Sequence, residues 1–170
     1  MEINPCHRTK ARKKLKSTED EAKQYALKLL SYRGRSVKEL KERLRRKKFP
    51  DDVVSCTIGH LQRVGLLDDK ALAESLKREA LTTKFLSQYG AKRFMLERGI
   101  SREIIDLTLS NDETEDINNA KRLVEKKMKI IDALPAEKRK RRLSHLLLRK
   151  GYSFEIIETV LKNKLNGGMA

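Results

Sequence analysis

The stretch Gly151-Tyr152-Ser153-Phe154-Glu155-Ile156-Ile157 ends one helix and begins another, and it decides the fold because it recurs. The same order of residue types stands at Gly99-Ile100-Ser101-Arg102-Glu103-Ile104-Ile105 and at Lys48-Phe49-Pro50-Asp51-Asp52-Val53-Val54. The offsets between the copies are 51 and 52 residues, and a period in this range is typical of stacked supersecondary units. The sequence therefore predicts one structural unit that recurs about three times.

Each copy contains signals for both helix ends. Gly99 and Gly151 can adopt the left-handed conformation that closes a helix. Ser101 and Ser153 can cap the helix that follows, and a proline such as Pro50 suits the first helical position. Lys48 stands where the other copies have glycine, so we expect it to strain or reshape its corner.

Outward from these corners, hydrophobic periodicity predicts helices and no strand of useful length. Capping boxes at Thr18–Glu21 and Ser36–Glu39 open the first two helices, and Pro135 opens the second helix of the last repeat. We expect an all-α fold, an elongated and curved array of three tandem three-helix repeats that are helix-turn-helix-like. The predicted parts are a basic disordered tail over 1–17, repeats over 18–65, 66–111 and 112–166, and a C-terminal tail over 167–170.

Composition limits the core and indicates the partner. Hydrophobic residues make up 38% of the 170 residues and tryptophan is absent, which suits modest aliphatic cores, one in each repeat. The formal net charge of +16 predicts an anionic partner or a polyanionic scaffold. The alternative is a well-solvated basic surface without a partner.

Cysteine usage and targeting signals favour a cytoplasmic location. Cys6 and Cys56 form no disulfide framework, and no Cys-x-x-Cys motif is present. The basic N-terminus lacks the apolar segment of a secretory signal, and no apolar run approaches the length of a membrane span. We therefore expect no contact with a membrane.

The sequence offers no catalytic, metal or cofactor site. It has neither a phosphate-binding glycine loop nor a dinucleotide fingerprint, and its histidines are scattered. Cys56 and His60 would share a helix face, but two ligands do not make a zinc site, and we expect a half-buried Cys56 beside an exposed His60. The acidic pairs Asp51–Asp52 and Asp68–Asp69 stand at helix starts, where capping is the better interpretation than acid–base catalysis.

Clusters of basic residues are the stronger functional signal. The cluster from Lys138 to Arg142 lies early in a helix, where cations oppose the helix dipole and repel one another, so a functional need is indicated. Equivalent helices of the other repeats are also basic. The candidate partner-binding or nucleic-acid-binding residues are Lys41, Arg43, Arg45, Arg46, Lys47, Lys92, Arg93, Lys138, Arg139, Arg141 and Arg142. Part of this charge could be incidental, because Lys and Arg are good helix formers and Glu39 and Glu42 offset the first cluster.

Sequence-specific recognition of DNA is not favoured. A helix-turn-helix reader needs a recognition helix with base-reading side chains, whereas the third helices here are apolar or acidic. Contact with the phosphate backbone is the safer expectation, and the few aromatic residues argue against a base-stacking platform. Leu96 and Leu148, off the main core stripe where the first repeat has Arg45, either form a packing face or widen the core.

An ordered set of motifs resembles the bacterial RecX family. The motifs are Leu29-Leu30-Ser31-Tyr32-Arg33-Gly34-Arg35-Ser36-Val37-Lys38-Glu39-Leu40 followed by Leu44 and Phe49, then Gly65-Leu66-Leu67-Asp68-Asp69 with Ala73, and Arg149-Lys150-Gly151-Tyr152-Ser153. The resemblance runs from about Ala22 to Leu165, and its specificity lies in the order and spacing of the set. Lys48 departs from it, because that family usually has glycine before its first Phe.

The resemblance implies a regulator of the RecA recombinase. Members of the family are tandem three-helix repeats that lie in the groove of the RecA–DNA filament and restrain filament assembly, ATP hydrolysis and strand exchange. The expected partners are therefore the RecA filament and single- and double-stranded DNA, with the chain a monomer that is no enzyme and needs no cofactor. The alternative from a different class is a stand-alone, largely sequence-independent DNA-binding protein.

Overall fold

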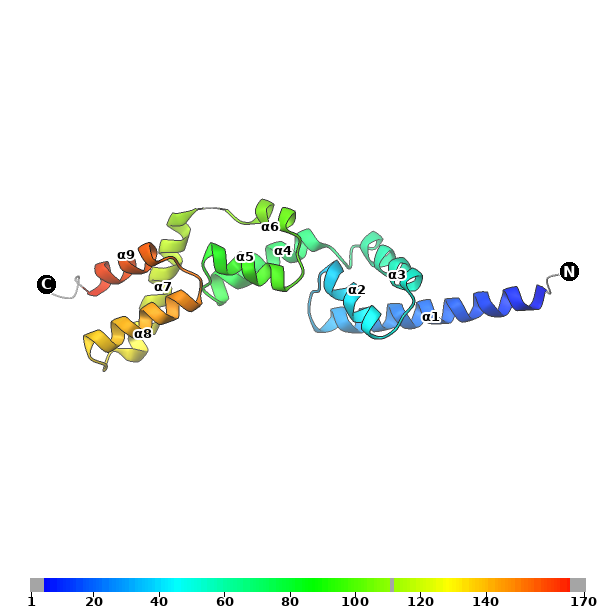
Figure 1. The fold of residues 1–170 in the computed structure, drawn as a ribbon, viewed down its shortest axis with the longest axis horizontal. Helices are drawn as coiled ribbons and strands as arrows, with labels where there is room; N and C mark the ends of the chain where they lie inside the picture. Colours follow the sequence, from blue (N-terminus) through cyan, green and yellow to red (C-terminus); the bar gives the residue numbers. More distant parts are fainter. Residues whose placement is uncertain (1–4, 111, 166–170) are drawn as a thin grey trace. The chain divides into compact units, whose positions relative to one another are not determined.

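The structure, a computed structural model, describes residues 5–110 and 112–165 (Figure 1). All regular secondary structure among these residues is helical, as predicted. The contacts divide the chain into two compact units, Met1–Leu72 with Arg98–Ile100, and Ala73–Glu97 with Ser101–Ala170. We describe each unit by itself; the three repeat boundaries stay a prediction.

The first helix is longer than predicted. α1 spans Pro5–Tyr32, so the expectation of a disordered tail is wrong for residues 5–17, and the Thr18–Glu21 box lies inside the helix. Proline is well suited to the first helical position, and Lys and Arg have high helix propensity, so this basic stretch can extend a helix that the core stabilises further on. Residues 1–4 and the predicted tail over 167–170 lie outside the described residues.

The first unit packs α1 and α2 against α3 (Figure 1). α2 spans Val37–Arg46 and begins at the predicted cap Ser36, whose hydroxyl accepts a hydrogen bond from the backbone of Glu39. α3 spans Asp51–Arg63. Their aliphatic stripes bury a shared core, which consists of Ala22, Ala26, Leu40, Leu44, Val53, Val54, Ile58, Leu61 and Leu67.

The corner at Lys48 is strained rather than reshaped. Lys48 adopts a left-handed conformation with φ 62°, as Gly99 and Gly151 do at 80° and 90°. The Lys48 amide donates to the Arg45 carbonyl at 2.8 Å, and the equivalent Gly151 amide donates to the Leu148 carbonyl at 2.9 Å. The same helix-closing bonds therefore form with lysine, although a side chain disfavours this backbone by about 1–2 kcal/mol.

The second unit consists of shorter helices followed by a three-helix bundle. Its elements are α4 (Asp69–Arg78, which begins in the first unit), the π-helix η1 (Glu79–Thr83), α5 (Gln88–Glu97), α6 (Arg102–Thr108), α7 (Glu113–Ile131), α8 (Ala136–Arg149) and α9 (Phe154–Leu165). α6, α8 and α9 each begin directly after the predicted starts Ser101, Pro135 and Ser153, whereas the π-helix was not predicted. The bundle of α7, α8 and α9 buries Leu123, Val124, Leu143, Leu147 and Val160.

One serine hydroxyl in the first unit serves two helix ends. The Oγ of Ser36 accepts from the Glu39 amide at 3.1 Å and donates to the carbonyl of Arg98, at the end of α5, at 2.8 Å. Beside it, the Asp69 carboxylate accepts from the Val37 amide at 2.9 Å. These bonds satisfy backbone groups that helix ends otherwise leave without partners. We call this arrangement the serine joint.

The second unit contains a second serine joint, whose closest acceptor carbonyl lies one position further along the repeat than in the first joint. The Oγ of Ser87 accepts from the Gly90 amide at 3.0 Å and donates to the carbonyl of Gly151, after α8, at 2.7 Å. The Asp116 carboxylate accepts from the Gln88 amide at 2.8 Å, as Asp69 does for Val37. A serine hydroxyl and an aspartate carboxylate therefore satisfy backbone groups at helix ends in each unit.

Acidic residues at helix starts have different tasks. Asp68 is the cap that was predicted, because its Oδ1 accepts from the amides of Lys70 and Ala71 at 2.8 and 3.1 Å. Asp51 instead pairs with Arg45 at 2.8 Å, so its carboxylate reaches the preceding helix and the capping interpretation is wrong there. Pro50 is the N-cap of α3, one position before the first helical position that was predicted for it, and no side chain caps this helix.

The second joint requires a glycine in α5. A Cβ on Gly90 would lie 2.3 Å from the carbonyl oxygen of Lys150, which is a backbone atom that cannot move away alone. Gly59 in α3 is the opposite case, because a Cβ there would meet no atom within 4 Å.

We predict that Gly90→Ala destabilises the chain and that Gly59→Ala stabilises it. Overpacking of this kind typically costs about 1–3 kcal/mol, whereas alanine in an open helical position gains about 0.5–1 kcal/mol over glycine. Urea unfolding of both variants measures the two effects. Equal stabilities would contradict the close approach of α5 and the end of α8.

Burial at each serine joint raises the pKa of its carboxyl above the ordinary value of 3.8. For Asp69 and for Asp116 desolvation is the main cause, opposed by the backbone hydrogen bond that each accepts. The folded state therefore binds this proton more tightly than the unfolded state. The contribution of each group to stability falls as the pH rises from the ordinary value through the raised pKa.

We predict that Asp116→Asn removes part of the loss of stability that accompanies rising pH. Asparagine keeps an oxygen for the Gln88 amide and deletes the buried charge. The free energy of unfolding of the variant should therefore rise relative to that of the parent as the pH rises above about 4. Urea unfolding across a pH series measures the difference. Asp112→Asn is the control of opposite sign, because hydrogen bonds from Thr114 lower the pKa of Asp112. Parallel profiles for the parent and Asp116→Asn would contradict the assignment.

Candidate functional site

The helix α8 has three sides of different chemistry. Leu143 and Leu147 are buried in the core of the bundle. Lys140, Ser144 and Leu148, four residues apart, line a groove against α9. The third side is basic and solvent-exposed, and we call it the α8 basic face; it consists of Lys138, Arg141, Arg142, His145 and Arg149. Such separation follows from the helical period of 3.6 residues.

Carboxylates of the described residues do not neutralise the α8 basic face. None of its five members forms an ion pair with a carboxylate in the part of the chain that the structure describes. Arg141, Arg142, His145 and Arg149 line an open hollow of about 510 Å³. Like charges three and four residues apart repel one another, so an anion in this hollow would relieve an unfavourable interaction.

Arg139 belongs to a different environment. Its guanidinium donates to the Asp132 carbonyl at 2.9 Å and pairs with the Asp132 carboxylate at 3.2 Å, and its side chain is only 23% exposed. The contact ties the loop before α8 to the helix. Of the four candidates on α8, Lys138, Arg141 and Arg142 therefore share the exposed face, and Arg139 does not.

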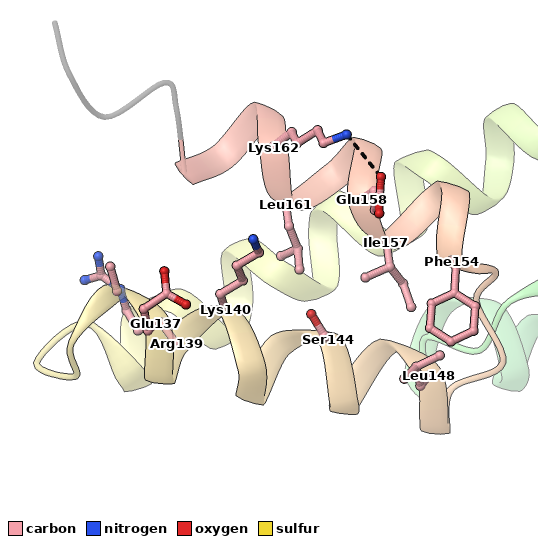
Figure 2. Close-up of a pocket in the computed structure, with 11 residues that line it drawn as sticks. Glu137, Arg139, Lys140, Ser144, Leu148, Phe154, Ile157, Glu158, Leu161 and Lys162 are labelled. Carbon is pink, nitrogen blue, oxygen red and sulfur yellow. Dashed lines mark hydrogen bonds and ion pairs between the residues drawn. The ribbon is translucent and has the colours of Figure 1, made fainter.

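An apolar groove of about 470 Å³ runs between α8 and α9 (Figure 2). Leu148, Phe154, Ile157 and Leu161 face one another across it, and Lys140 and the ion pair between Lys162 and Glu158 stand at its edges. Leu148 is 39% exposed and Leu96 is 36% exposed, so neither leucine widens a core as one sequence interpretation held. Leu148 instead lines the groove.

The candidates on α2 are exposed but partly engaged. Arg45 pairs with Asp51, and the ammonium of Lys47 lies 5.6 Å from the centre of the Tyr25 ring. Arg43 and Arg46 are exposed, and Lys41 is half-buried. No ion pair joins these last three to a carboxylate of the described residues.

The candidates on α5 are offset by acids. Lys92 lies 2.5 Å from the Asp106 carboxylate, and Arg93 lies 3.6 Å from that of Glu97. Both pairs are exposed and contribute little stability, but they reduce the positive charge that α5 presents. A continuous basic surface across all three repeats stays a prediction.

Sequence reasoning missed two parts of the basic surface. His145 and Arg149 follow Arg141 at intervals of four residues and extend the α8 basic face by two turns; that periodicity was the available signal. Helix α7 is the second omission, since it carries exposed cations of its own. They include Lys121, Arg122, Lys126 and Lys129.

A metal centre finds no support within residues 5–110 and 112–165. No group of three His, Cys, Asp or Glu side chains comes together there. Cys56 is exposed and His60 is half-buried, which reverses the burial that we expected for this pair. None of the described helices is long and apolar enough to cross a membrane.

Comparison with known proteins identifies the family. The model of the first three-helix domain of RecX matches residues 22–61, and the model of its third three-helix domain matches residues 113–161. "Regulatory protein RecX" of Amycolatopsis mediterranei is 30% identical over 85% of this chain and 83% of its own length. The chain belongs to the RecX family. A second relative of the same name, from Streptomyces coelicolor, is 29% identical over 86% of this chain and 78% of its own length.

The RecX fold is shared with solved structures. The crystal structure of RecX from Lactobacillus salivarius has a TM-score of 0.69 with 26% identity, and the match covers 86% of this chain and 96% of that one. The relatives are named regulatory proteins, and tandem three-helix domains are what their family models describe. The chain therefore has the regulatory role that the names of its RecX relatives state.

We predict that the double variant Arg141→Gln/Arg142→Gln binds DNA more weakly and with a shallower salt dependence. Glutamine keeps helix propensity, and each lost phosphate contact should reduce the slope of log affinity against log salt by roughly one unit. Thermal stability should hold or rise, because a repulsion disappears. Fluorescence anisotropy with labelled duplex DNA measures both quantities.

Two controls separate charge from folding. Arg93→Gln removes a cation that Glu97 already offsets, so its effect on the salt slope should be smaller. Leu147→Ala should cost about 2–5 kcal/mol of stability and weaken binding only through unfolding. An unchanged salt slope in the double variant would mean that the α8 basic face is solvated and has no anionic partner.

Proposed function

We propose that this RecX-family chain is a non-enzymatic regulator of RecA filaments. It binds in the groove of the RecA–DNA filament as a cytoplasmic monomer and restrains ATP hydrolysis, filament growth and strand exchange, in recombination and in the SOS response. The observation that carries the proposal is family membership together with an exposed basic face that carboxylates of the described residues leave unneutralised.

The surfaces of α8 suit a partner that contains both protein and DNA. The α8 basic face offers long cationic side chains to phosphates, which is how proteins gain most of their sequence-independent affinity for DNA. The groove beside α9 offers Leu148, Phe154 and Ile157 to an apolar side chain, with charged groups at its edge. One helix can therefore contact DNA and protein on different sides.

Regulation by binding also agrees with the chemistry of the side chains. The acidic residues with shifted pKa values are at helix starts and in the serine joints, where each accepts backbone hydrogen bonds. The fold explains the environment of these three carboxylates, so their shifted pKa values do not indicate acid–base catalysis.

The test measures the DNA-dependent ATPase of RecA from the same organism. We expect the purified chain to lower this activity at equimolar or smaller amounts, and Arg141→Gln/Arg142→Gln to lower it less at equal concentration. The control is Arg93→Gln, which should act like the parent. An ATPase rate and a filament length that the chain leaves unchanged would contradict the proposal.

The second candidate function is stand-alone DNA binding, with the regulation of RecA secondary. The unpaired cations of the α8 basic face favour it. Tight binding to bare DNA with a steep salt slope, without any effect on the RecA ATPase, would support it. Failure to bind bare DNA below about 50 mM salt, with filament binding intact, would exclude it.

A further inference from the structure

The backbone at Phe85 is the most unusual of the second unit. Phe85 adopts a left-handed conformation with φ 50°, which is a true outlier for a bulky side chain. It follows the π-helix η1 directly, and such helices are frequent at functional sites. The hydroxyl of Tyr152 donates to the Phe85 carbonyl at 3.2 Å and holds this conformation. The fold therefore fixes the Phe85 ring in place at a cost in strain.

Two cations of α7 converge on this ring. The guanidinium carbon of Arg122 lies 5.8 Å from the ring centre, and the ammonium of Lys126 lies 5.4 Å from it. The two cations are four residues apart on one helix, where like charges repel. Neither pairs with a carboxylate of the described residues, so their charge is available to an anion.

A hollow of about 540 Å³ opens beside the ring. It is lined by Phe85, Arg122, Glu125, Lys126, Met128 and Lys129, three cations against one carboxylate. Phe85 packs against the bundle core with its partly buried ring, and Met128 adds a second apolar contact. The exposed arms of Arg122, Lys126 and Lys129 can move without disturbing that core.

We propose that this hollow, which we call the Phe85 hollow, binds one nucleotide of single-stranded DNA. The base stacks on the Phe85 ring and against Met128. The side chains of Arg122, Lys126 and Lys129 bind the flanking phosphates. Aromatic rings bordered by cations are how proteins hold single strands without reading sequence. One rigid ring is sufficient for one base, even in a chain with few aromatic residues.

The chemistry distinguishes a single strand from other polyanions. A duplex keeps its bases stacked inside, so it can use the cations but not the ring. An acidic peptide could also pair with the cations, but its carboxylate side chains cannot stack on a flat aromatic ring. The strained backbone holds the Phe85 ring beside the cations of α7, which is the arrangement that a stacked base can use.

This inference deepens the proposed function, because it assigns a DNA contact to Phe85 and the cations of α7, yet its test needs no RecA. The chain contains no tryptophan, so Phe85→Trp introduces a single fluorescent reporter. An oligothymidylate of about 15 nucleotides should quench this emission, because a stacked base quenches indole. Inorganic polyphosphate and poly-glutamate should bind and leave it unchanged.

Leu107→Trp is the matched reporter. Leu107 on α6 is 84% exposed, so tryptophan there is tolerated and its emission should not respond to any of the three polyanions. Quenching of Phe85→Trp by polyphosphate as strong as that by oligothymidylate would overturn the stacking role. Equal quenching by poly-glutamate would assign the Phe85 hollow to an acidic protein segment and overturn the proposal as well.

Phe85→Leu tests affinity without a reporter, since leucine keeps the apolar contact and removes the ring. We expect affinity for oligothymidylate to fall about tenfold and affinity for duplex DNA to stay the same. If leucine or tryptophan prevents cooperative folding, Arg122→Gln/Lys126→Gln replaces it, read by the emission of 2-aminopurine in the oligonucleotide. An unchanged oligothymidylate affinity in folded Phe85→Leu, or the same 2-aminopurine signal with parent and double variant, would overturn the proposal. The RecA ATPase of these variants reports the proposed function separately.

Discussion

A serine hydroxyl that serves two helix ends at once is the contact on which the repeats depend. Ser36 and Ser87 each accept from an amide in the first turn of their own helix and donate to a carbonyl at the end of a helix from the next repeat. Both ends would otherwise expose polar backbone groups at a buried junction, which is costly. The hydrogen bond from the serine to the carbonyl is short, so the two backbone segments must approach closely. Gly90 and the left-handed Gly99 and Gly151 make that approach possible, and Asp69 and Asp116 complete it at the price of a desolvated carboxylate.

The fold leaves α8 with a face that has no structural task. Core packing uses Leu143 and Leu147, and the contact with the preceding loop uses Arg139. The basic side bears charge that other helices of the chain neutralise, as α5 does through Asp106 and Glu97. Helices tolerate such repulsion at a few tenths of a kcal/mol per pair, so stability alone does not remove it. Its presence on one face, beside an apolar groove, is what the proposed binding of a polyanion rests on.

Much of the fold was predictable because its signals are local. Each corner contains its own stop and start residues, and the repeat period confirms them three times. The predictions that were wrong concern features that no local motif in the sequence determines. The basic stretch from Pro5 to Lys16 has no hydrophobic period, so only its propensity could indicate that α1 continues. The partners Asp106 and Asp132 come from other elements, and spacing along one helix cannot reveal them. At Phe85 the backbone is set by η1, Tyr152 and α7 together, and no pattern in the sequence encodes that combination.

The strained corner at Lys48 has a consequence for where joints can form. A joint needs a serine at the start of the second helix of one repeat and a glycine after the second helix of the next. The first repeat has Lys48 where the glycine would stand, and the third has Pro135, which lacks a hydroxyl, as the N-cap of α8. The two outer repeats therefore lack the serine and the glycine that form a joint, so the arrangement that joins neighbouring repeats has no matching residues at either end of the series.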